Sequence, residues 1–257
     1  MTQPLEGPTS RTPADLPKAM RLAWGLEEAG SRGPRKGLTL DRVLDAAIEV
    51  ADVEGLAGLS MSRVAKQLGF TTMSLYRYVD SKDDLIELMA DRAIGAPPAD
   101  LPVSGRCRDR LEAWARAEYR SARVHAWWAE LSISAPPTGP NNLSWLEAGL
   151  RTLADTTLPE DTKVQVVLNV SLFVIGRARF VNDLERSAAS TTPVDYSQML
   201  PLLLDRERFP ALLSAIAAGA FDPDGSDDAD WLEDDFRFGL DRMLDGIDRL
   251  VEKTDAG

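Results

Sequence analysis

Apolar side chains recur every three or four residues through most of this chain, which is the spacing of amphipathic helices. The first such pattern begins after Thr39, which is placed as an N-cap, and ends at Gly55. The same spacing predicts helices over residues 81–94, 106–134, 142–153, 161–187 and 231–251, and one or two helices over 196–220 around Pro201 and Pro210. No strand pattern interrupts them, so the predicted fold class is all-α.

Between residues 60 and 79 the pattern shortens to two helices that meet across a single glycine. Ser60 is placed to cap the first, Gly69 ends it where a tight turn needs positive φ, and the second is predicted from Thr72 to Val79. Two short helices between two longer ones are the layout of a helix-turn-helix, whose second helix enters the major groove of DNA.

A helical wheel of the second short helix separates an inner side from an outer side. Leu75 and Val79 point inward, so Met73 and Arg77 point outward. Arg77 can donate two hydrogen bonds to guanine, and Met73 can contact a thymine methyl group. The other predicted DNA contacts are Ser60, Ser62, Thr71, Thr72, Ser74, Tyr76, Tyr78 and Lys82. The alternative is that both helices are ordinary parts of a bundle and the tyrosines serve packing.

The N-terminal residues 1–36 are rich in proline and glycine and lack sustained periodicity, which predicts a mobile basic arm. Residues 19–29 could still form a short helix that carries Trp24. The basic side chains nearest the first long helix are Arg32, Arg35 and Lys36, which can enter a minor groove or serve only as a tether. The cluster Gly95-Ala96-Pro97-Pro98 marks a boundary between residues 37–97 and 98–257.

The charge of the chain is uneven. The formal net charge of −12 argues at first sight against DNA binding, because affinity for phosphate comes from clustered lysine and arginine. Most of the negative excess lies beyond residue 95, however, and within residues 60–82 the only acid, Asp80, is opposed by Arg63, Lys66, Arg77 and Lys82. A small basic face on an acidic body suits a protein that touches DNA at one place.

Several classes of protein are disfavoured. The one cysteine, Cys107, excludes an intrachain disulfide, and no segment approaches the roughly 20 apolar residues of a membrane helix. A cytoplasmic protein is therefore expected. The chain has no HExxH, GxSxG, P-loop, GxGxxG or cysteine-histidine motif, so neither an enzyme nor a cofactor is predicted. A helical bundle for protein interactions is the remaining rival, but it would not explain the basic face.

An acidic loop over residues 222–233 places oxygen side chains at several positions of a calcium-binding EF-hand loop. Its Gly225 stands at the fourth loop position instead of the sixth, and Ala229 takes the hydrophobic position. A solvated loop that precedes the last helix is the favoured interpretation, and no metal site is predicted.

Residues 38–95 resemble the N-terminal domain of the tetracycline-repressor (TetR) family. The resemblance is carried by Gly55, Leu59-Ser60, Val64-Ala65, Leu68-Gly69, Leu75-Tyr76, Val79, Lys82 and Leu85 at unbroken spacing. It implies a three-helix DNA-binding domain over residues 37–97, and a larger helical domain over 98–257 that binds a small-molecule effector and forms a homodimer. Ser62 departs from the arginine that some relatives use to contact a base.

The resemblance also implies a pseudo-palindromic double-stranded DNA operator, matched by the two-fold symmetry of the dimer. The long helix around residues 164–180 and the last helix from Trp231 are the dimer candidates. Candidate effector contacts are the aromatic and polar residues Trp114, Tyr119, Trp127, Trp128, Trp145, Asn169, Phe173 and Arg177. Each aromatic has core packing as its alternative, Arg177 a surface salt bridge, and the single histidine, His125, is interpreted as incidental.

Overall fold

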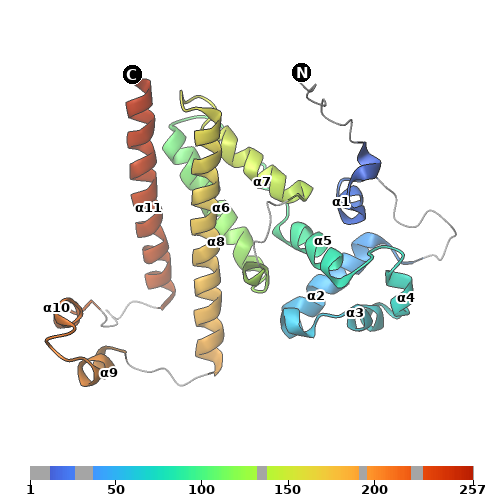
Figure 1. Ribbon diagram of the computed structural model, residues 1–257, viewed down its shortest axis with the longest axis horizontal. Coiled ribbons are helices and arrows are strands. Elements are labelled where there is room, and N and C mark those ends of the chain that lie inside the picture. The colour runs from blue at the N-terminus through green and yellow to red at the C-terminus, as the bar shows by residue number, and fades with distance from the viewer. Residues whose placement is uncertain (1–11, 27–36, 132–137, 191–195, 221–227, 257) are drawn as a thin grey trace, which may run out of the picture.

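The computed structural model describes residues 12–26, 37–131, 138–190, 196–220 and 228–256. Within these ranges every regular element is helical, which confirms the all-α prediction (Figure 1). The N-terminal part contains η1 (Pro13–Asp15), α1 (Lys18–Ala23), α2 (Leu40–Gly58), α3 (Met61–Leu68), α4 (Thr72–Leu75) and α5 (Lys82–Ile94). The C-terminal part contains α6 (Cys107–Val124), η2 (Trp128–Glu130), α7 (Pro140–Arg151), α8 (Glu160–Ser190), α9 (Tyr196–Leu203), α10 (Pro210–Ala217) and α11 (Asp228–Asp255).

Helices α2, α3 and α5 enclose the first hydrophobic core, to which α4 adds Leu75. Three of these helices begin at a capping hydroxyl, as the sequence predicts. Thr39, Ser60 and Ser81 each accept a hydrogen bond from the backbone N–H three residues later. The last turn of α2 follows a break at Gly55, whose φ of 69° is favourable only for glycine.

Part of the segment predicted as a mobile arm is docked on the N-terminal helical domain. α1 packs against α5 with Ala19 and Leu22 buried, and Lys18 Nζ lies 2.6 Å from Asp80 Oδ1. The structure therefore differs from the arm prediction over residues 12–26, because Ala19 and Leu22 give a short helix an apolar face to bury. Arg32, Arg35 and Lys36 lie outside the described residues.

The second core is centred on α6 and α8, with α7 and α11 packed against them. Glycine permits two of the closest approaches. A Cβ at Gly149 of α7 would lie 2.6 Å from Val167 and 3.0 Å from the ring of Trp114. A Cβ at Gly239 of α11 would lie 2.7 Å from the ring of Phe173 on α8. Either substitution would force the helices apart.

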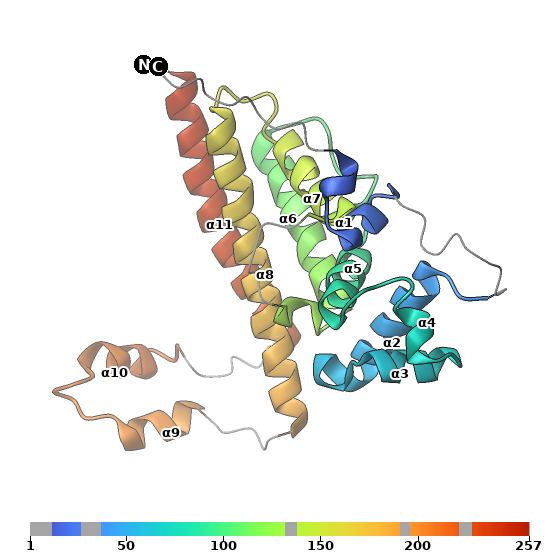
Figure 2. The same cartoon turned by 45° about the vertical axis from the view of Figure 1, so that its right-hand side comes forward.

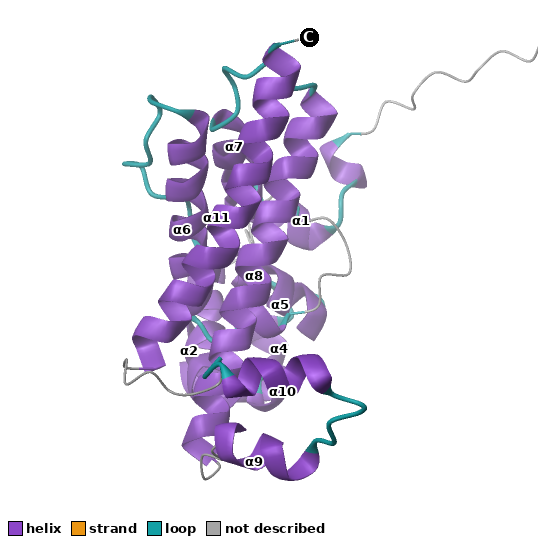
Figure 3. Cartoon of the chain, turned by 90° about the vertical axis from the view of Figure 1, so that its left-hand side faces the viewer, coloured by secondary structure: helices purple, strands orange, loops and turns teal. Residues whose placement is uncertain are grey.

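The outer layer of the C-terminal domain consists of α8 and α11, on the side away from α2, α3, α4 and α5 (Figure 1). Figure 3, which views the chain from the α11 side, shows α8 and α11 side by side above α9 and α10. The sequence predicts one or two helices over 196–220, and the structure has two that extend away from the bundle (Figure 2). Pro201 lies within the first, and Pro210 begins the second.

By length and composition alone, residues 160–187 of α8 could cross a membrane, whereas the sequence pattern predicts no such segment. In the most apolar 18-residue stretch of this helix, 33% of the residues are buried inside the protein. Core helices of soluble proteins can have the same length and apolar composition as a membrane-spanning helix. The prediction and the structure differ because Gln165, Asn169 and Ser171 interrupt the apolar residues of α8, yet the helix as a whole remains predominantly apolar. Its exposed apolar side chains bear on assembly, as argued below.

The junction between the two domains is formed by residues that the sequence assigns to one long helix over 106–134. That helix is shorter than predicted: α6 ends at Val124, and His125 has extended backbone angles. The chain then turns toward the DNA-binding domain, where Trp127 Nε1 donates to Asp52 Oδ1 of α2 at 2.7 Å. Trp128 Nε1 donates to the carbonyl of Ala90 in α5 at 2.9 Å. Tertiary packing of the two tryptophans therefore overrides local helix propensity.

A second link across the junction is the buried carboxylate of Asp91 in α5. It accepts the backbone N–H groups of Asn141 and Asn142 at 3.2 and 2.9 Å and caps the N-terminus of α7. A Cβ at Gly139 would lie 2.2 Å from its Oδ1, so glycine makes room for the cap. The first turn of α7 in the C-terminal domain is thus held by a residue of α5, the helix that ends the N-terminal domain.

Candidate nucleic-acid interface

Helix α4 presents its outer face to solvent as the helical wheel predicts. Leu75 and Val79 are fully buried, whereas the side chain of Met73 is 74% exposed and that of Tyr76 is 42% exposed. Arg77 is also exposed. Helix α3 supports α4 from behind and ends at Gly69, which adopts the left-handed conformation with φ of 72°. This is a helix-turn-helix with a free outer surface.

The second helix of the helix-turn-helix, here called the reading helix, has a regular part that is shorter than the predicted span of residues 72–79. α4 ends at Leu75, and the N–H groups of Tyr78 and Val79 both donate to the Leu75 carbonyl, at 2.8 and 3.1 Å. Threonine, serine and aromatic residues have modest helix propensities, which favours a turn here. Tyr78, predicted to contact DNA, donates its hydroxyl to the carbonyl of Leu38 at 2.7 Å. It thereby positions the reading segment against the start of α2.

The serine and threonine residues predicted to contact DNA lie in two groups, one at the start of α3 and one at the start of α4. Ser60 is partly occupied as the cap of α3, with its Oγ 3.2 Å from the Oγ of the exposed Ser62. Thr71 and Ser74 pair with each other at 3.0 Å between their hydroxyl oxygens, and Thr72 begins α4. These groups lie at the N-terminal ends of α3 and α4, where backbone N–H groups also point outward. The arrangement suits contact with phosphate oxygens.

The local electrostatics favour an anionic partner. Asp80, the only acid between residues 60 and 82, is engaged by Lys18. Arg63 donates to Glu54 at 2.7 Å and is directed along the surface of α2. Lys82, in the first turn of α5, is exposed, and no carboxylate of the described residues pairs with it. Exposed positive charge therefore concentrates beside the outer face of α4.

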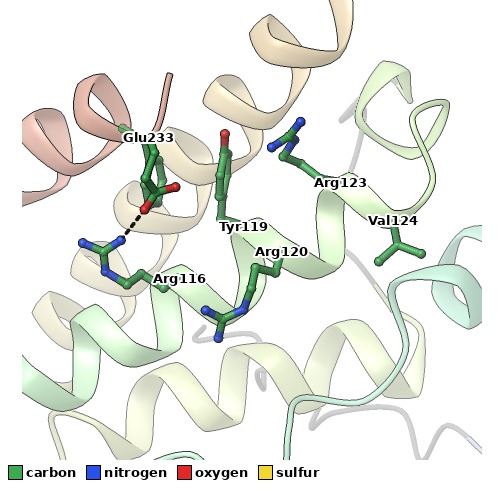
Figure 4. A pocket seen from close by; sticks show the side chains of 7 residues that line it. Arg116, Tyr119, Arg120, Arg123, Val124 and Glu233 are labelled. Atoms are coloured by element: carbon green, nitrogen blue, oxygen red, sulfur yellow. Dashed lines mark hydrogen bonds and ion pairs between the residues drawn. The ribbon is translucent and has the colours of Figure 1, made fainter. Parts of the chain in front are cut away.

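Among the described residues, two cavities border the C-terminal domain, and the predicted effector contacts are divided between these cavities and the core. The smaller cavity, of about 370 Å³, lies between α6 and α11 and is lined by Tyr119 and Phe236 with several charged residues (Figure 4). The rings of Tyr119 and Phe236 stack with centroids 4.1 Å apart, and Arg116 pairs with Glu233 at 2.8 Å. The larger cavity, of about 810 Å³, includes Trp114.

The other six predicted contacts line neither cavity. Trp127 and Trp128 tie the domains together, and the indole of Trp145 donates to the Gly95 carbonyl at 2.9 Å. Asn169 is exposed and donates to the Gln165 carbonyl, Phe173 packs against Phe236, and Arg177 forms an ion pair with Asp235. The salt-bridge alternative for Arg177 is therefore the one observed. Helical spacing alone cannot separate core aromatics from cavity walls.

Glu118 is a buried polar residue that the predictions did not include. Its side chain is 6% exposed, one carboxylate oxygen accepts the hydroxyl of Ser171 at 2.7 Å, and the other has no partner among the described residues. Burial raises the pKa of Glu118 to about 7, against the opposing effect of the Ser171 hydrogen bond. The signal was present in the sequence as an acid on the apolar side of α6.

A metal centre is not seen in the part of the chain that the structure describes, where no three histidine, cysteine or acidic side chains converge. Residues 222–227 of the acidic loop lie outside that part. His125, interpreted as incidental, lies at the domain junction with its Nδ1 2.8 Å from Asp52 Oδ1. It therefore contributes to the link between α2 and the C-terminal domain.

Comparison with known proteins identifies both halves of this arrangement. The family model described as "Bacterial regulatory proteins, tetR family" matches residues 43–89, and "Tetracyclin repressor-like, C-terminal domain" matches residues 98–251. The chain belongs to the TetR family. It is therefore a DNA-binding transcriptional regulator whose reading head is the helix-turn-helix of α3 and α4.

Similar proteins cover from 60% to 92% of this chain. The HTH-type transcriptional repressor DrrR1 of Streptomyces coeruleorubidus is 38% identical over 246 residues, which span 92% of this chain and 87% of that protein. An HTH-type transcriptional regulator of Saccharopolyspora erythraea is 31% identical over 153 residues, or 60% of this chain and 64% of its own. The TetR-family protein ActR of Streptomyces coelicolor, solved in complex with actinorhodin, has a TM-score of 0.67 and 25% identity, covering 82% of this chain and 95% of ActR.

Proposed function

We propose that the protein is a cytoplasmic, homodimeric repressor that binds a pseudo-palindromic operator through α4 and releases it when a small-molecule effector occupies the C-terminal domain. The observation that carries the proposal is the outer face of α4, where Met73, Tyr76 and Arg77 are exposed beside Lys82, which pairs with no carboxylate in the described part of the chain. The similarity to a named repressor over 92% of the chain supports repression in particular.

The dimer is proposed to form through α8 and α11. The exposed apolar side chains of α8 are Leu168, Leu172, Phe180 and Leu184, and those of α11 are Trp231, Phe238 and Leu250. Gly176 and Gly246 lie among them, and a Cβ at either would meet no described atom within 4 Å apart from its chain neighbours and the backbone of its own helix. Packing among the described residues does not require glycine at these two positions, whereas close approach of a second copy would. Two helices from each copy would form a four-helix bundle.

The two-fold axis of such a dimer gives the operator its symmetry. Two copies of α4 can enter successive major grooves only if the dimer holds them about one helical turn of DNA apart, roughly 34–36 Å. An effector can bind more tightly to a dimer whose two copies of α4 have a different separation than to the operator-binding conformation. The difference between these two effector affinities sets how far operator affinity falls. The hydrogen bonds from Trp127 and Trp128 and the cap from Asp91 transmit such a change.

The effector is proposed to bind between α6 and α7. Trp114 is retained as a direct effector contact because it lines the larger cavity, and Tyr119, which lines the smaller cavity, is assigned to its stacking on Phe236. Trp127, Trp128 and Trp145 are assigned to the domain junction, and Phe173, Asn169 and Arg177 to the α8 surface and its packing against α11. The structure of ActR in complex with actinorhodin supports a small-molecule effector for this chain.

Two substitutions at the interface should separate base contact from phosphate contact. Arg77→Ala is expected to weaken operator binding by about 1–3 kcal/mol and to relax base preference. Lys82→Ala should weaken binding to all sequences and reduce the salt dependence by about one unit of slope. Gel shifts with the upstream DNA of the gene itself, and with base-substituted fragments over a range of salt concentrations, measure both effects.

A matched control for charge removal is Arg106→Ala, on the C-terminal domain, where the side chain is 70% exposed. It should leave operator affinity within about twofold, since a distant charge is screened by salt. Failure of the wild-type protein to shift any upstream fragment at low salt would overturn the proposed function. A loss at Arg77 that is equal for all DNA sequences would reassign Arg77 to phosphate.

A further inference from the structure

The larger cavity has a wall that comes from outside both matched domains. It opens between α6, α7 and the segment that joins α5 to α6, with Trp114, Leu143 and the prolines 97, 102 and 140 among its lining residues. Trp24, which follows α1, also lines it. The family models match residues 43–89 and 98–251, so Trp24 is a feature of this chain beyond the matched domains.

The walls of this cavity are suited to a flat apolar molecule. Tryptophan and proline rings present rigid apolar surface, and about 810 Å³ falls within the range of sites for drug-sized ligands. The buried Arg110 is already satisfied, because its guanidinium donates to the carbonyls of Thr152 and Gly105 and pairs with Asp155. The cavity therefore offers shape and apolar area rather than an unsatisfied buried charge.

The charged groups at the mouth cancel. Glu147 and Arg151 lie one turn apart on α7, are both exposed, and their side chains form no ion pair or hydrogen bond with a described residue. Their opposite charges give the mouth no net preference for an anion or a cation. Because charge does not select the ligand, the tryptophan and proline walls of the cavity select it by its flat shape and aromatic surface.

Trp24 connects the cavity to the DNA-binding domain. Its indole Nε1 donates to the carbonyl of Thr138, just before α7, at 2.8 Å, while its ring is 45% exposed. The helix before it, α1, is seated on α5 through Ala19 and Leu22, and Lys18 pairs with Asp80 at the end of the reading segment. A molecule that displaces or holds Trp24 acts on a helix attached to the reading head.

We propose that this cavity is an effector site for a flat, uncharged aromatic molecule, and that Trp24 forms its movable wall and couples its occupancy to the DNA-binding domain. The inference rests on the proposed function, because an effector has meaning only for a protein that binds an operator. It deepens that function by assigning the site, the class of ligand and the residue through which the two domains communicate.

The experiment uses the full chain and the flat, uncharged fluorescent dye Nile red. Titration of the wild-type protein should give saturable, blue-shifted emission with one dye per protomer. Ser144→Trp fills the cavity from an exposed position of its wall and should weaken dye binding at least tenfold. Trp24→Ala should weaken it at least fivefold, and Trp24→Phe, which keeps an aromatic wall, should stay within twofold of the wild type.

The matched control is Val124→Trp, which adds the same ring at a 69% exposed position of the smaller cavity and should leave dye affinity unchanged. Saturating dye should lower operator affinity at least threefold in the wild type and leave it unchanged in Ser144→Trp. Helical circular dichroism and a cooperative thermal transition establish that each variant is folded.

The outcomes separate the site from the function on which it rests. Equal dye binding by the wild type and Ser144→Trp, or an equal loss in Val124→Trp, would overturn the site. Dye that binds in the cavity without changing operator affinity would overturn the effector assignment. Absence of operator binding by the dye-free wild type would instead overturn the proposed function, whatever the dye titration gives.

Discussion

Leu172→Arg is expected to convert the protein to a monomer and to lower operator affinity by about 100-fold or more. Leu172 is 53% exposed at the middle of the apolar surface of α8. In a two-fold dimer the same patch serves both copies, so one substitution introduces two arginines, each desolvated without an acid opposite it. Loss of the dimer separates the two reading heads, and each head then binds a half-site without the gain from the other.

Sedimentation equilibrium and gel shifts on the same samples measure the two effects together. The matched control is Val124→Arg, which makes the same kind of change at an exposed position of α6 outside the apolar surface. It should remain dimeric and bind the operator normally. A Leu172→Arg protein that is still dimeric would place the interface elsewhere and remove the reason for the exposed glycines Gly176 and Gly246.

The reading head was predictable because its determinants are local. The capping hydroxyls of Ser60 and Ser81, the turn at Gly69 and the inward positions of Leu75 and Val79 all follow from spacing, and the structure places each where the sequence indicates. Even there, the hydrogen bond from Tyr78 to Leu38 was not predictable, since it joins residues 40 positions apart.

The C-terminal domain was less predictable because its determinants are tertiary. Trp127 and Trp128 continue a helical pattern in sequence, but α6 stops before them so that both indoles can reach acceptors in α2 and α5. Trp114 and Trp145 are buried to nearly the same extent, and only Trp114 lines a cavity. Which aromatic faces a cavity depends on where helices approach closely, which is set by glycines such as Gly149.

Glu118 should make the stability of the protein depend on pH in the direction opposite to that of most carboxyl groups. Its pKa is raised to about 7 in the folded protein, mainly by burial, from an ordinary value of 4.5. The folded state therefore holds a proton that the unfolded chain releases between these two values. Its contribution is most favourable below about pH 4.5, and the free energy of unfolding falls by about 3 kcal/mol as the pH rises to 7 and above.

Glu118→Gln removes this titration while keeping the shape of the side chain. At pH 8 the variant is expected to be more stable than the wild type by about 1–2 kcal/mol, because an uncharged amide replaces a buried carboxylate but leaves one polar group poorly satisfied. At pH 4.5 the advantage should vanish. Urea unfolding followed by circular dichroism, at fixed protein concentration, measures both differences, and the comparison at each pH cancels carboxyls such as Asp155, whose pKa is lowered beside Arg110.

Ser171→Ala provides the companion test, since it deletes the hydroxyl that donates to Glu118. Without that hydrogen bond the pKa of Glu118 should rise further, so the decline in stability should extend to higher pH than in the wild type. One variant that removes the titration and one that moves it to higher pH together identify the group responsible. If Glu118→Gln and the wild type lose stability in parallel between pH 5 and pH 8, the buried carboxyl is ionised at little cost, and a polar contact that satisfies its second oxygen must be sought.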